Sequence, residues 1–258
     1  VELDLTGNEI ETFSGEISNL TNLQMLDISY NRLKEIPELP KSLKKIFANN
    51  NQIQKIADAE MPSLEYAIFS CNELESLPKF TNHISPSLFF SHNNIKLITL
   101  DMMIRPVEQL NLADNDITEI PVELFKMPRL RILNLDSNKI TEIPEAISES
   151  NISSLLISQN PIKKIPKLPK SLDSLFASYC EIEDVSEIFV NCLRITKICL
   201  SGNKIQKFPS SESLKFPHLQ ILSLSQCGLT NFPSEFLINE DATCKIVSLD
   251  ISYNMIES

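Results

Sequence analysis

One eleven-residue pattern recurs along the whole chain, and it limits what the chain can fold into more than any other feature. The pattern is Leu-x-x-Leu-x-Leu-x-x-Asn-x-Leu, and its clearest copy is LRILNLDSNKI at residues 130–140. LQMLDISYNRL at residues 23–33 and VEQLNLADNDI at residues 107–117 follow it as well. Because self-similarity at a regular spacing is the signature of repeat architectures, we expect a stack of similar units.

We number the repeats by the asparagine of the pattern, and we call the position of this asparagine the slot. Successive slots are 20 to 27 residues apart, and two of the twelve hold cysteine. The slots of copies 1 to 12 are Asn8, Asn31, Asn51, Asn72, Asn93, Asn115, Asn138, Asn160, Cys180, Asn203, Cys227 and Asn254. Copies 3 and 9 each follow a 20-residue interval, which explains why PKSLKKIFANNNQI at residues 40–53 and PKSLDSLFASYCEI at residues 169–182 look so alike.

With twelve copies in phase, the chain resembles the leucine-rich repeat family. The Leu-x-Leu pair in each copy alternates with a period of two, so both side chains point to one face of a short strand. One strand cannot bury that face alone, but stacked copies can, each covering the next. We therefore predict an α/β fold, a curved leucine-rich repeat solenoid of about twelve repeats with a parallel β-sheet on its concave face.

The residues after each strand predict the rest of the coil. A buried slot asparagine can satisfy backbone groups of its own turn and of the neighbouring copy, and cysteine at Cys180 and Cys227 keeps a small side chain with a weak donor. Many copies then continue into an Ile-Pro pair, such as Ile36-Pro37, where proline ends strand pairing. We expect extended segments on the convex face of short copies, and short helices or 3-10 turns in PVELFKM and VSEIFVNCL.

We interpret residues 1–258 as a single leucine-rich repeat domain that begins and ends within a repeat. Val1 already lies in a predicted strand, and Ser258 follows the last slot by four residues. Solenoids need terminal units with a polar outer face, and none is visible here. We therefore expect a fragment of a longer chain, with end-to-end self-association through the uncapped ends as an alternative.

Composition excludes several classes of partner. The net charge is −11, whereas nucleic acids and anionic membranes require clustered Lys and Arg, so we expect no nucleic-acid partner. No apolar run approaches the roughly 20 residues that cross a bilayer, so we expect no membrane insertion. The six cysteines form no CxxC pair, which favours a reducing compartment and a cytoplasmic location.

The predicted concave face carries the candidate binding residues. Counting Leu23 as position 1 of its copy, positions 3 and 5 point away from the core. At position 5, consecutive copies place Phe47, Ile68 and Phe89 side by side. Exposed apolar patches indicate interaction sites, and aromatic residues are frequent anchors of protein interfaces. The predicted protein-binding residues are Met25, Lys45, Phe47, Tyr66, Ile68, Phe89, Leu156 and Phe176.

Two other interpretations of the strand residues stay open. Tight curvature can half-bury a position-5 phenylalanine, which then serves the fold rather than a partner. Position 8 places Cys71, His92 and Asp114 on three successive copies, and these residue types suggest a nucleophile, base and orienter or part of a zinc site. Because the column continues with Ser137 and Gln159 and no oxyanion hole is apparent, we expect no catalytic residue, no metal site and no cofactor.

The resemblance implies a function in protein recognition. Members of the family act as adaptors and as targeting arms of signalling enzymes, so we expect a protein partner and no enzyme activity in this chain. One alternative is the regulatory domain of a larger phosphatase, kinase, cyclase or GTPase regulator. A second is a secreted bacterial effector acting in a host cytosol, since the 20-residue copies resemble such proteins. A third is a receptor ectodomain with a glycan on Asn19 or Asn151.

Overall fold

The computed structural model describes residues 1–81, 86–99, 106–192, 194–205, 218–231 and 246–257. The chain divides into two compact units, unit 1 from Val1 to Ile132 and unit 2 from Leu133 to Ser258. Each unit is built from the same repeating coil, in which a three-residue strand is followed by a tight turn and a return segment. Cys244 lies outside the described residues.

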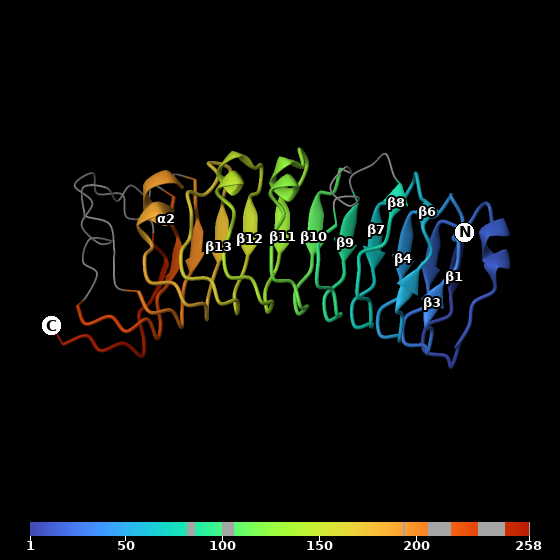
Figure 1. Cartoon of the computed structure of the whole chain (residues 1–258), viewed down its shortest axis with the longest axis horizontal. Coiled ribbons are helices and arrows are strands. Elements are labelled where there is room, and N and C mark those ends of the chain that lie inside the picture. The colour runs from blue at the N-terminus through green and yellow to red at the C-terminus, as the bar shows by residue number, and fades with distance from the viewer. Residues whose placement is uncertain (82–85, 100–105, 193, 206–217, 232–245, 258) are drawn as a thin grey trace. The chain divides into compact units, whose positions relative to one another are not determined.

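In unit 1 the strands of successive repeats pair in parallel and in chain order (Figure 1). They are β1 (Glu2–Asp4), β2 (Met25–Asp27), β4 (Lys45–Phe47), β7 (Tyr66–Ile68), β9 (Ser87–Phe89) and β10 (Gln109–Asn111). The register is one to one, with Leu26 opposite Ile46 and Ile46 opposite Ala67. Equivalent positions of neighbouring repeats therefore line up in columns across the sheet.

The alternation expected of these strands is confirmed. The middle residue of each inner strand is buried, as for Leu26, Ile46 and Ala67, while both of its neighbours are at least partly exposed. Burial of one such side chain contributes about 1.5–3 kcal/mol, and every copy repeats it. We call the outward side chains at positions 3 and 5 the strand face.

The return segments of unit 1 take the expected extended and helical forms. In the short copies they form two-stranded parallel pairs, β3 (Glu35–Ile36) with β5 (Lys55–Ile56) and β6 (Ala59–Glu60) with β8 (Phe80–Thr81). β3 ends directly before Pro37, which has no N–H to donate. Longer copies carry 3-10 helices instead. These are η1 (Gly15–Asn19) and η2 (Val122–Lys126).

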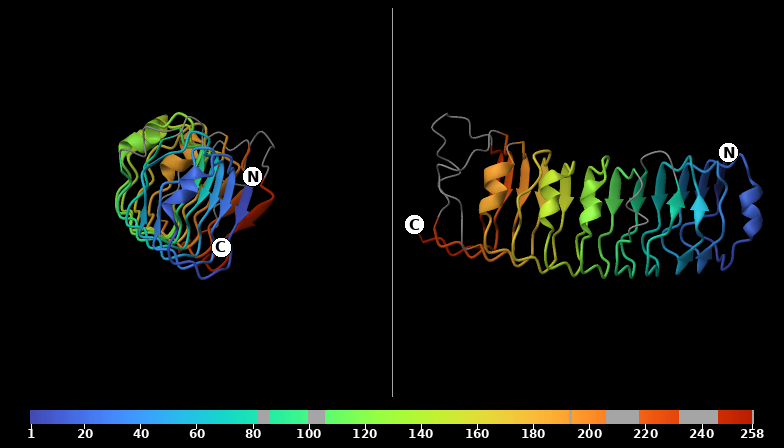
Figure 2. Two further views of the ribbon diagram at one scale, coloured as in Figure 1. Left: turned by 90° about the vertical axis from the view of Figure 1, so that its right-hand side faces the viewer. Right: turned by 45° about the horizontal axis from the view of Figure 1, so that its top comes forward.

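Unit 2 follows the same plan. β11 (Ile132–Asn134) spans the division between the units, and the later strands pair in parallel in chain order. These are β12 (Ser154–Leu156), β13 (Ser174–Phe176), β14 (Lys197–Cys199), β15 (Ile221–Ser223) and β16 (Ser248–Asp250). The 3-10 helix η3 (Glu145–Glu149) and the α-helix α2 (Ser186–Asn191) lie on the side of their coils away from the strands (Figure 2).

The helical segments refine the sequence prediction at one position. PVELFKM forms a single 3-10 helix, and Pro121 is its N-cap with extended backbone angles rather than its first helical residue. The same arrangement recurs at Pro144 before η3. Leu124 and Phe125 of η2 are buried, so one short turn is enough to close the outer side of the coil.

A ladder of slot asparagines ties each copy to the one before it. The Asn93 side chain donates to the carbonyls of Phe69, 3.0 Å away in the preceding copy, and of Phe90, 3.1 Å away in its own. Its oxygen accepts from the Leu74 backbone N–H at 3.0 Å. Asn31, Asn51, Asn72, Asn115, Asn160 and Asn203 repeat these bonds. We call this column the asparagine ladder.

Cysteine at a slot preserves only half of this arrangement. The Cys180 thiol donates to the Ile157 carbonyl at 3.4 Å, as predicted for a weak donor. It cannot replace the amide oxygen, so the backbone N–H of Ile162 instead bonds locally to the Asn160 carbonyl at 2.8 Å. Cys227 likewise donates to the Leu200 carbonyl at 3.2 Å.

Every repeat makes its turn with a left-handed residue at position 8, directly before the slot. The φ angles lie between 53° and 74°, although only two of the twelve residues are glycine. The column is Gly7, Tyr30, Asn50, Cys71, His92, Asp114, Ser137, Gln159, Tyr179, Gly202, Gln226 and Tyr253. This conformation costs a non-glycine residue roughly 1–2 kcal/mol. Backbone bonds to the next copy hold it, as from Tyr30 N–H to the Asn49 carbonyl at 2.9 Å.

Candidate functional site

Three aromatic rings form a continuous surface on the strand face of unit 1. The ring centroids of Phe47 and Tyr66 lie 5.8 Å apart, and those of Tyr66 and Phe89 lie 5.1 Å apart, with interplanar angles of 49° and 47°. Such tilted pairs are favourable aromatic contacts. All three residues are half-buried. We call Phe47, Tyr66 and Phe89 the aromatic cluster.

The other predicted residues of this region lie around the cluster. Ile68 is in register with Phe47 on one side and Phe89 on the other. Lys45 is exposed and lies between Met25 and Tyr66 in the position-3 column. The structure thus brings together the six unit 1 residues proposed from the sequence. It also supports part of the structural alternative, because the phenylalanines are half-buried.

The fold itself favours a different residue at position 5. In five copies this position is Asp or Asn, and its side-chain oxygen accepts the backbone N–H two residues later. The pairs are Asp4–Thr6, Asp27–Ser29, Asn111–Ala113, Asn134–Asp136 and Asp250–Ser252, at 2.9 to 3.0 Å. Phe and Ile cannot form this turn-stabilising bond. The apolar residues of copies 3 to 5 therefore forgo a local hydrogen bond, so the turn does not explain their presence.

The strand face of unit 2 carries a smaller apolar row. Leu156, Phe176 and Cys199 occupy position 5 of three neighbouring strands in register. The Lys197 ammonium lies 5.6 Å from the centroid of the Phe176 ring, within the range of a cation–π contact. We call these three position-5 residues the apolar row.

In the position-8 column, the structure pairs His92 with Asp114. His92 Nδ1 lies 2.5 Å from an Asp114 carboxylate oxygen, and both side chains are more than half exposed. Cys71 is an exposed free cysteine on the preceding copy. Across the described ranges, no group of three or more His, Cys, Asp or Glu side chains is placed to hold a metal ion.

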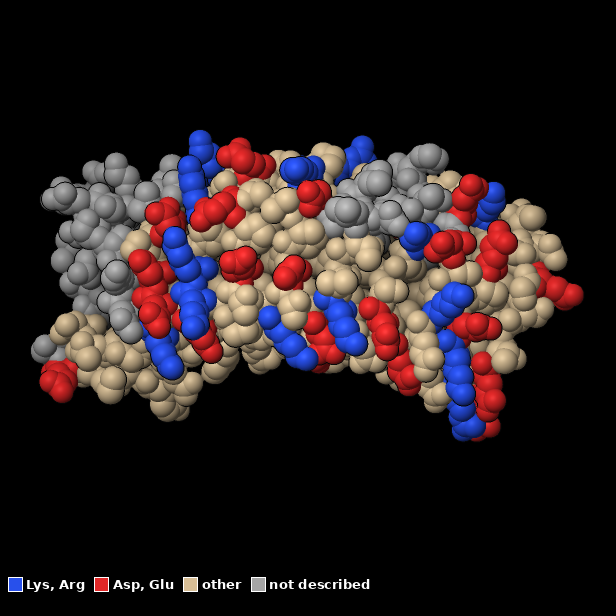
Figure 3. Space-filling view, in the orientation of Figure 1, with Lys and Arg blue, Asp and Glu red and all other residues tan. Residues whose placement is uncertain are grey.

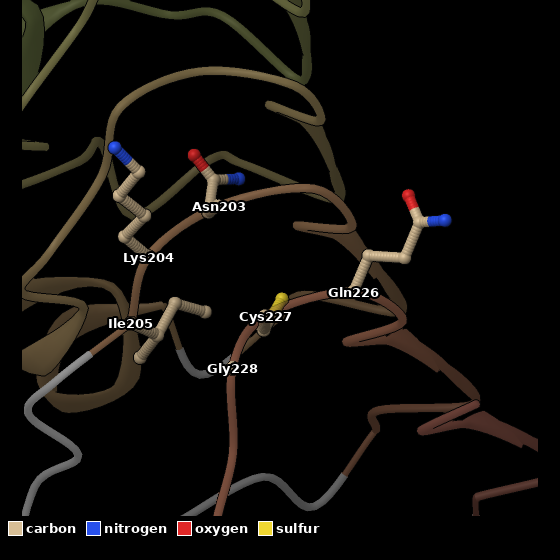
Figure 4. Close-up of a pocket in the computed structure, with 6 residues that line it drawn as sticks. All are labelled: Asn203, Lys204, Ile205, Gln226, Cys227 and Gly228. Atoms are coloured by element: carbon tan, nitrogen blue, oxygen red, sulfur yellow. The ribbon is translucent and has the colours of Figure 1, made fainter. Parts of the chain in front are cut away.

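A surface pocket of about 310 Å³ lies between two turns of unit 2 (Figure 4). One turn supplies Asn203, Lys204 and Ile205, and the next supplies Gln226, Cys227 and Gly228. Burial raises the pKa of the Cys227 thiol, which therefore stays protonated at neutral pH and is a poor nucleophile. The amide of Asn203 is already engaged in the ladder. Neither the thiol of Cys227 nor the amide of Asn203 is therefore an activated group.

In Figure 3, Lys and Arg side chains lie close to Asp and Glu side chains, with other residues between these charged groups. Pairs between neighbouring copies include Arg32–Glu9 at 3.2 Å and Lys41–Glu60 at 2.6 Å, with all four side chains largely exposed. Exposed pairs of this kind contribute little to stability. Among the described residues, no helix is both long enough and apolar enough to cross a bilayer.

Comparison with known proteins agrees with this geometry. The family model described as "Leucine rich repeat" matches residues 105–162, a model of two such repeats matches residues 1–41, and a single-repeat model matches residues 218–239. The chain is a leucine-rich repeat protein. The architecture of this leucine-rich repeat protein is that of a protein-interaction scaffold.

Individual relatives extend the similarity along the chain. Osteomodulin of Bos taurus is 28% identical over 259 residues, which cover 89% of this chain and 60% of osteomodulin. The chain thus spans about 60% of the length of that relative. A leucine-rich repeat protein of Leptospira interrogans has a TM-score of 0.81 at 24% identity, covering 99% of this chain and 67% of its own, and shows the shared fold.

A solved bacterial domain is similar over a shorter stretch. The leucine-rich repeat domain of a Shigella effector is 29% identical, with a TM-score of 0.50, and covers 63% of this chain and 70% of its own length.

Sequence reasoning missed three features of the strand side of this protein. It placed Tyr66 near the phenylalanines, but the structure puts it between them, in contact with both rings. The cation–π contact of Lys197 was not anticipated, although its position-3 location two residues before Cys199 was a usable signal. The left-handed position 8 had no glycine signal in ten of its twelve residues.

Proposed function

We propose that this leucine-rich repeat domain binds a protein partner through its strand face and acts as an adaptor or as the targeting domain of a signalling protein. The aromatic cluster is the centre of the binding surface, surrounded by Met25, Lys45 and Ile68. Leu156 and Phe176 of the apolar row form a second contact region. The chain has no chemistry of its own.

The observation that carries this proposal is the replacement of turn-stabilising Asp or Asn by large apolar residues in three consecutive copies. The replacement costs a local hydrogen bond and leaves aromatic surface partly exposed, which is unfavourable unless another molecule covers it. Aromatic residues among small polar neighbours are typical anchors of protein interfaces, and Ser70 and Ser91 supply such neighbours here.

Affinity capture from a lysate of the source cells, with quantitative mass spectrometry, tests the proposal. Three proteins are compared, namely the native chain, the Phe47→Ala/Phe89→Ala double variant and, as a control, Tyr253→Ala, which removes an exposed aromatic side chain outside both contact regions. We expect partners of the native chain to be lost by the double variant and largely retained by the control. Partners captured equally by all three proteins would show that the aromatic cluster is not the binding surface.

A second candidate is an effector that bacteria secrete into a host cytosol. The similarity to the Shigella effector domain and the 20-residue intervals before copies 3 and 9 favour it. Capture from host-cell lysate rather than bacterial lysate separates the two candidates, since an effector partner would be present only in the host.

We propose a cytosolic location for the binding module. Cys71, Cys180, Cys192, Cys199 and Cys227 are free thiols, which suits a reducing compartment. The competing receptor ectodomain would carry sugar on Asn19 or Asn151, both of which are exposed. Mass spectrometry of the natively expressed protein checks this, and a glycan on either residue would contradict a cytosolic location.

A further inference from the structure

The position-5 column of unit 1 changes chemistry along the sheet in one direction. Parallel pairing places its six members in register on β1, β2, β4, β7, β9 and β10. In that order they are Asp4, Asp27, Phe47, Ile68, Phe89 and Asn111. Asp27 therefore lies beside Phe47 at one edge of the aromatic cluster, with Asp4 one strand farther out, and the neutral amide of Asn111 lies beside Phe89 at the other edge.

These carboxylates have no cationic partner among the described residues. Asp4 and Asp27 each use Oδ1 to accept a backbone N–H at 2.9 Å, from Thr6 and Ser29 respectively. In Asp27 the second carboxylate oxygen remains available to a ligand. The hydrogen bonds from Thr6 lower the pKa of Asp4, which keeps that carboxylate ionised at neutral pH. The nearby Lys45 extends from position 3 and makes no ion pair with either of them.

We infer that the partner of this surface is a protein segment carrying an Arg or Lys side chain beside an apolar anchor. The apolar side chain covers the aromatic cluster, and the cation reaches Asp27 and Asp4. This inference rests on the proposed function and names the chemistry of its partner. Arginine fits best, because its planar guanidinium can pair with a carboxylate and stack on an aromatic ring at the same time.

The sheet geometry sets the spacing within that segment. Neighbouring strands are about 4.8 Å apart, so three strand steps from Asp27 to Phe89 span about 14 Å. An extended segment rises about 3.3 Å per residue, so the cation and the farthest apolar anchor are separated by about four residues. The net charge of −11 also attracts a basic segment before contact.

Selection of a random peptide library displayed on phage against the folded chain tests this inference. We expect enriched peptides that combine Arg or Lys with Phe, Trp, Leu or Met within about five residues. A synthetic copy of an enriched peptide then serves as the probe for measured affinities. We expect about tenfold weaker binding to the Asp27→Asn variant and loss of binding to the Phe47→Ala/Phe89→Ala variant.

The aspartate variant is designed to keep the fold intact. In the Asp27→Asn variant the side-chain oxygen can still accept the Ser29 N–H, so only the charge is lost. Asn111 already makes the equivalent bond, accepting the N–H of Ala113 at 3.0 Å. Asp250→Asn is the matched control, because Asp250 has the same position and the same turn bond but lies in unit 2. We expect the control to bind the probe with native affinity.

The outcomes separate this inference from the proposed function. Enriched peptides that are acidic or purely apolar, or that bind Asp27→Asn unchanged, overturn the basic partner while leaving the aromatic cluster as the binding surface. Peptides that still bind the double phenylalanine variant overturn both. A selection without enriched sequences also counts against the basic segment, because short segments of this chemistry are abundant in such a library.

Discussion

The two units are built from the same repeat but differ in the side chains at the slot and on the strand face. Unit 1 has asparagine at every slot and three rings in contact on its strand face. Unit 2 has cysteine at two slots, and the one aromatic residue of its apolar row lies near the ammonium of Lys197. The core positions are the same in kind in both, buried Leu, Ile or Ala at the middle of the inner strands.

This contrast shows which columns the fold depends on and which it leaves free. Slot and core residues contact neighbouring copies and vary little: the slots hold Asn or Cys, and the middle residues of the inner strands are Leu, Ile or Ala. Strand-face residues remain partly exposed, so they can change from carboxylate to ring between adjacent copies, as from Asp27 to Phe47. The strand-face columns can therefore vary in chemistry from copy to copy while the repeat itself is kept.

Variants of the slot residues in the asparagine ladder should show the largest difference in stability between the units. Asn93→Ala removes a buried side chain that makes bonds to three carbonyls and one N–H, and should lower the free energy of unfolding by about 3 kcal/mol. Cys180→Ala removes only weak thiol bonds and should cost about 1 kcal/mol. Urea denaturation followed by circular dichroism measures both. Equal losses would mean that the two kinds of slot contribute alike.

A second comparison uses the two glycines at position 8. A methyl group on Gly202 would lie 2.4 Å from a ring carbon of Tyr179, whereas one on Gly7 meets nothing within 4 Å. Both have positive φ, so Gly7→Ala should cost about 1 kcal/mol and Gly202→Ala about 2 kcal/mol. Thermal unfolding measures the difference. Adding Tyr179→Ala should reduce the Gly202→Ala loss to that of Gly7→Ala, and no such rescue would refute the steric cause.

The strand faces should also differ in stability, by a smaller amount. Tyr66→Ala removes two ring contacts and should cost about 1.5 kcal/mol beyond the lost burial. Phe176→Ala removes one cation–π contact, worth about 0.5–1 kcal/mol. Urea midpoints of the two variants compare them. A Tyr66 variant no less stable than the Phe176 variant would show that the rings of the aromatic cluster do not support one another.

The smallest expected changes in the free energy of unfolding come from replacing one aspartate in each unit by asparagine. These changes should have opposite signs in the two units. Burial raises the pKa of Asp136 above its ordinary 3.8, so its stabilising contribution is complete below that pH and is lost as pH rises through the folded-state value. Asp136→Asn should therefore stabilise unit 2 at pH 7 by about 0.5 kcal/mol, after allowance for solvent screening, and have no benefit in acid.

The contribution of Asp4 in unit 1 to stability has the opposite pH dependence. Hydrogen bonds from Thr6 lower the pKa of Asp4, so its contribution is present above pH 3.8 and is lost as pH falls through the folded-state value. Asp4→Asn should slightly destabilise the protein at pH 7. Denaturation midpoints of both variants between pH 3 and 7 test the pair of signs, and a shift in the same direction for both would contradict it.

Much of the fold followed from local pattern. Alternation at Leu26 and Leu155 predicted short strands with one buried face, and both side chains are buried. The Asn column predicted the ladder, and VSEIFVNCL predicted the helix at Ser186–Asn191. The division of helical turns into 3-10 and α forms was not predictable, because segments of five or six residues complete at most about two turns of either kind of helix.

The candidate site was predictable only as a set of columns. Position 5 of copies 3 to 5 could be read from the sequence, and those residues do lie on the strand face. Which rings touch could not, because Tyr66 stands at position 3 and reaches diagonally between Phe47 and Phe89. Such contacts depend on the register between copies of unequal length and on side-chain rotamers.

The sequence by itself determined the repeat, the buried core and the slot that joins each copy to the last, because all three depend on periodic residues whose environment is the same in every copy. Only the tertiary structure decided the left-handed turn at residues such as Tyr30, the ring contacts of Tyr66 and the ammonium over Phe176. These features arise between copies, where the stacking of one coil on the next fixes backbone angles and side-chain neighbours that no single repeat specifies.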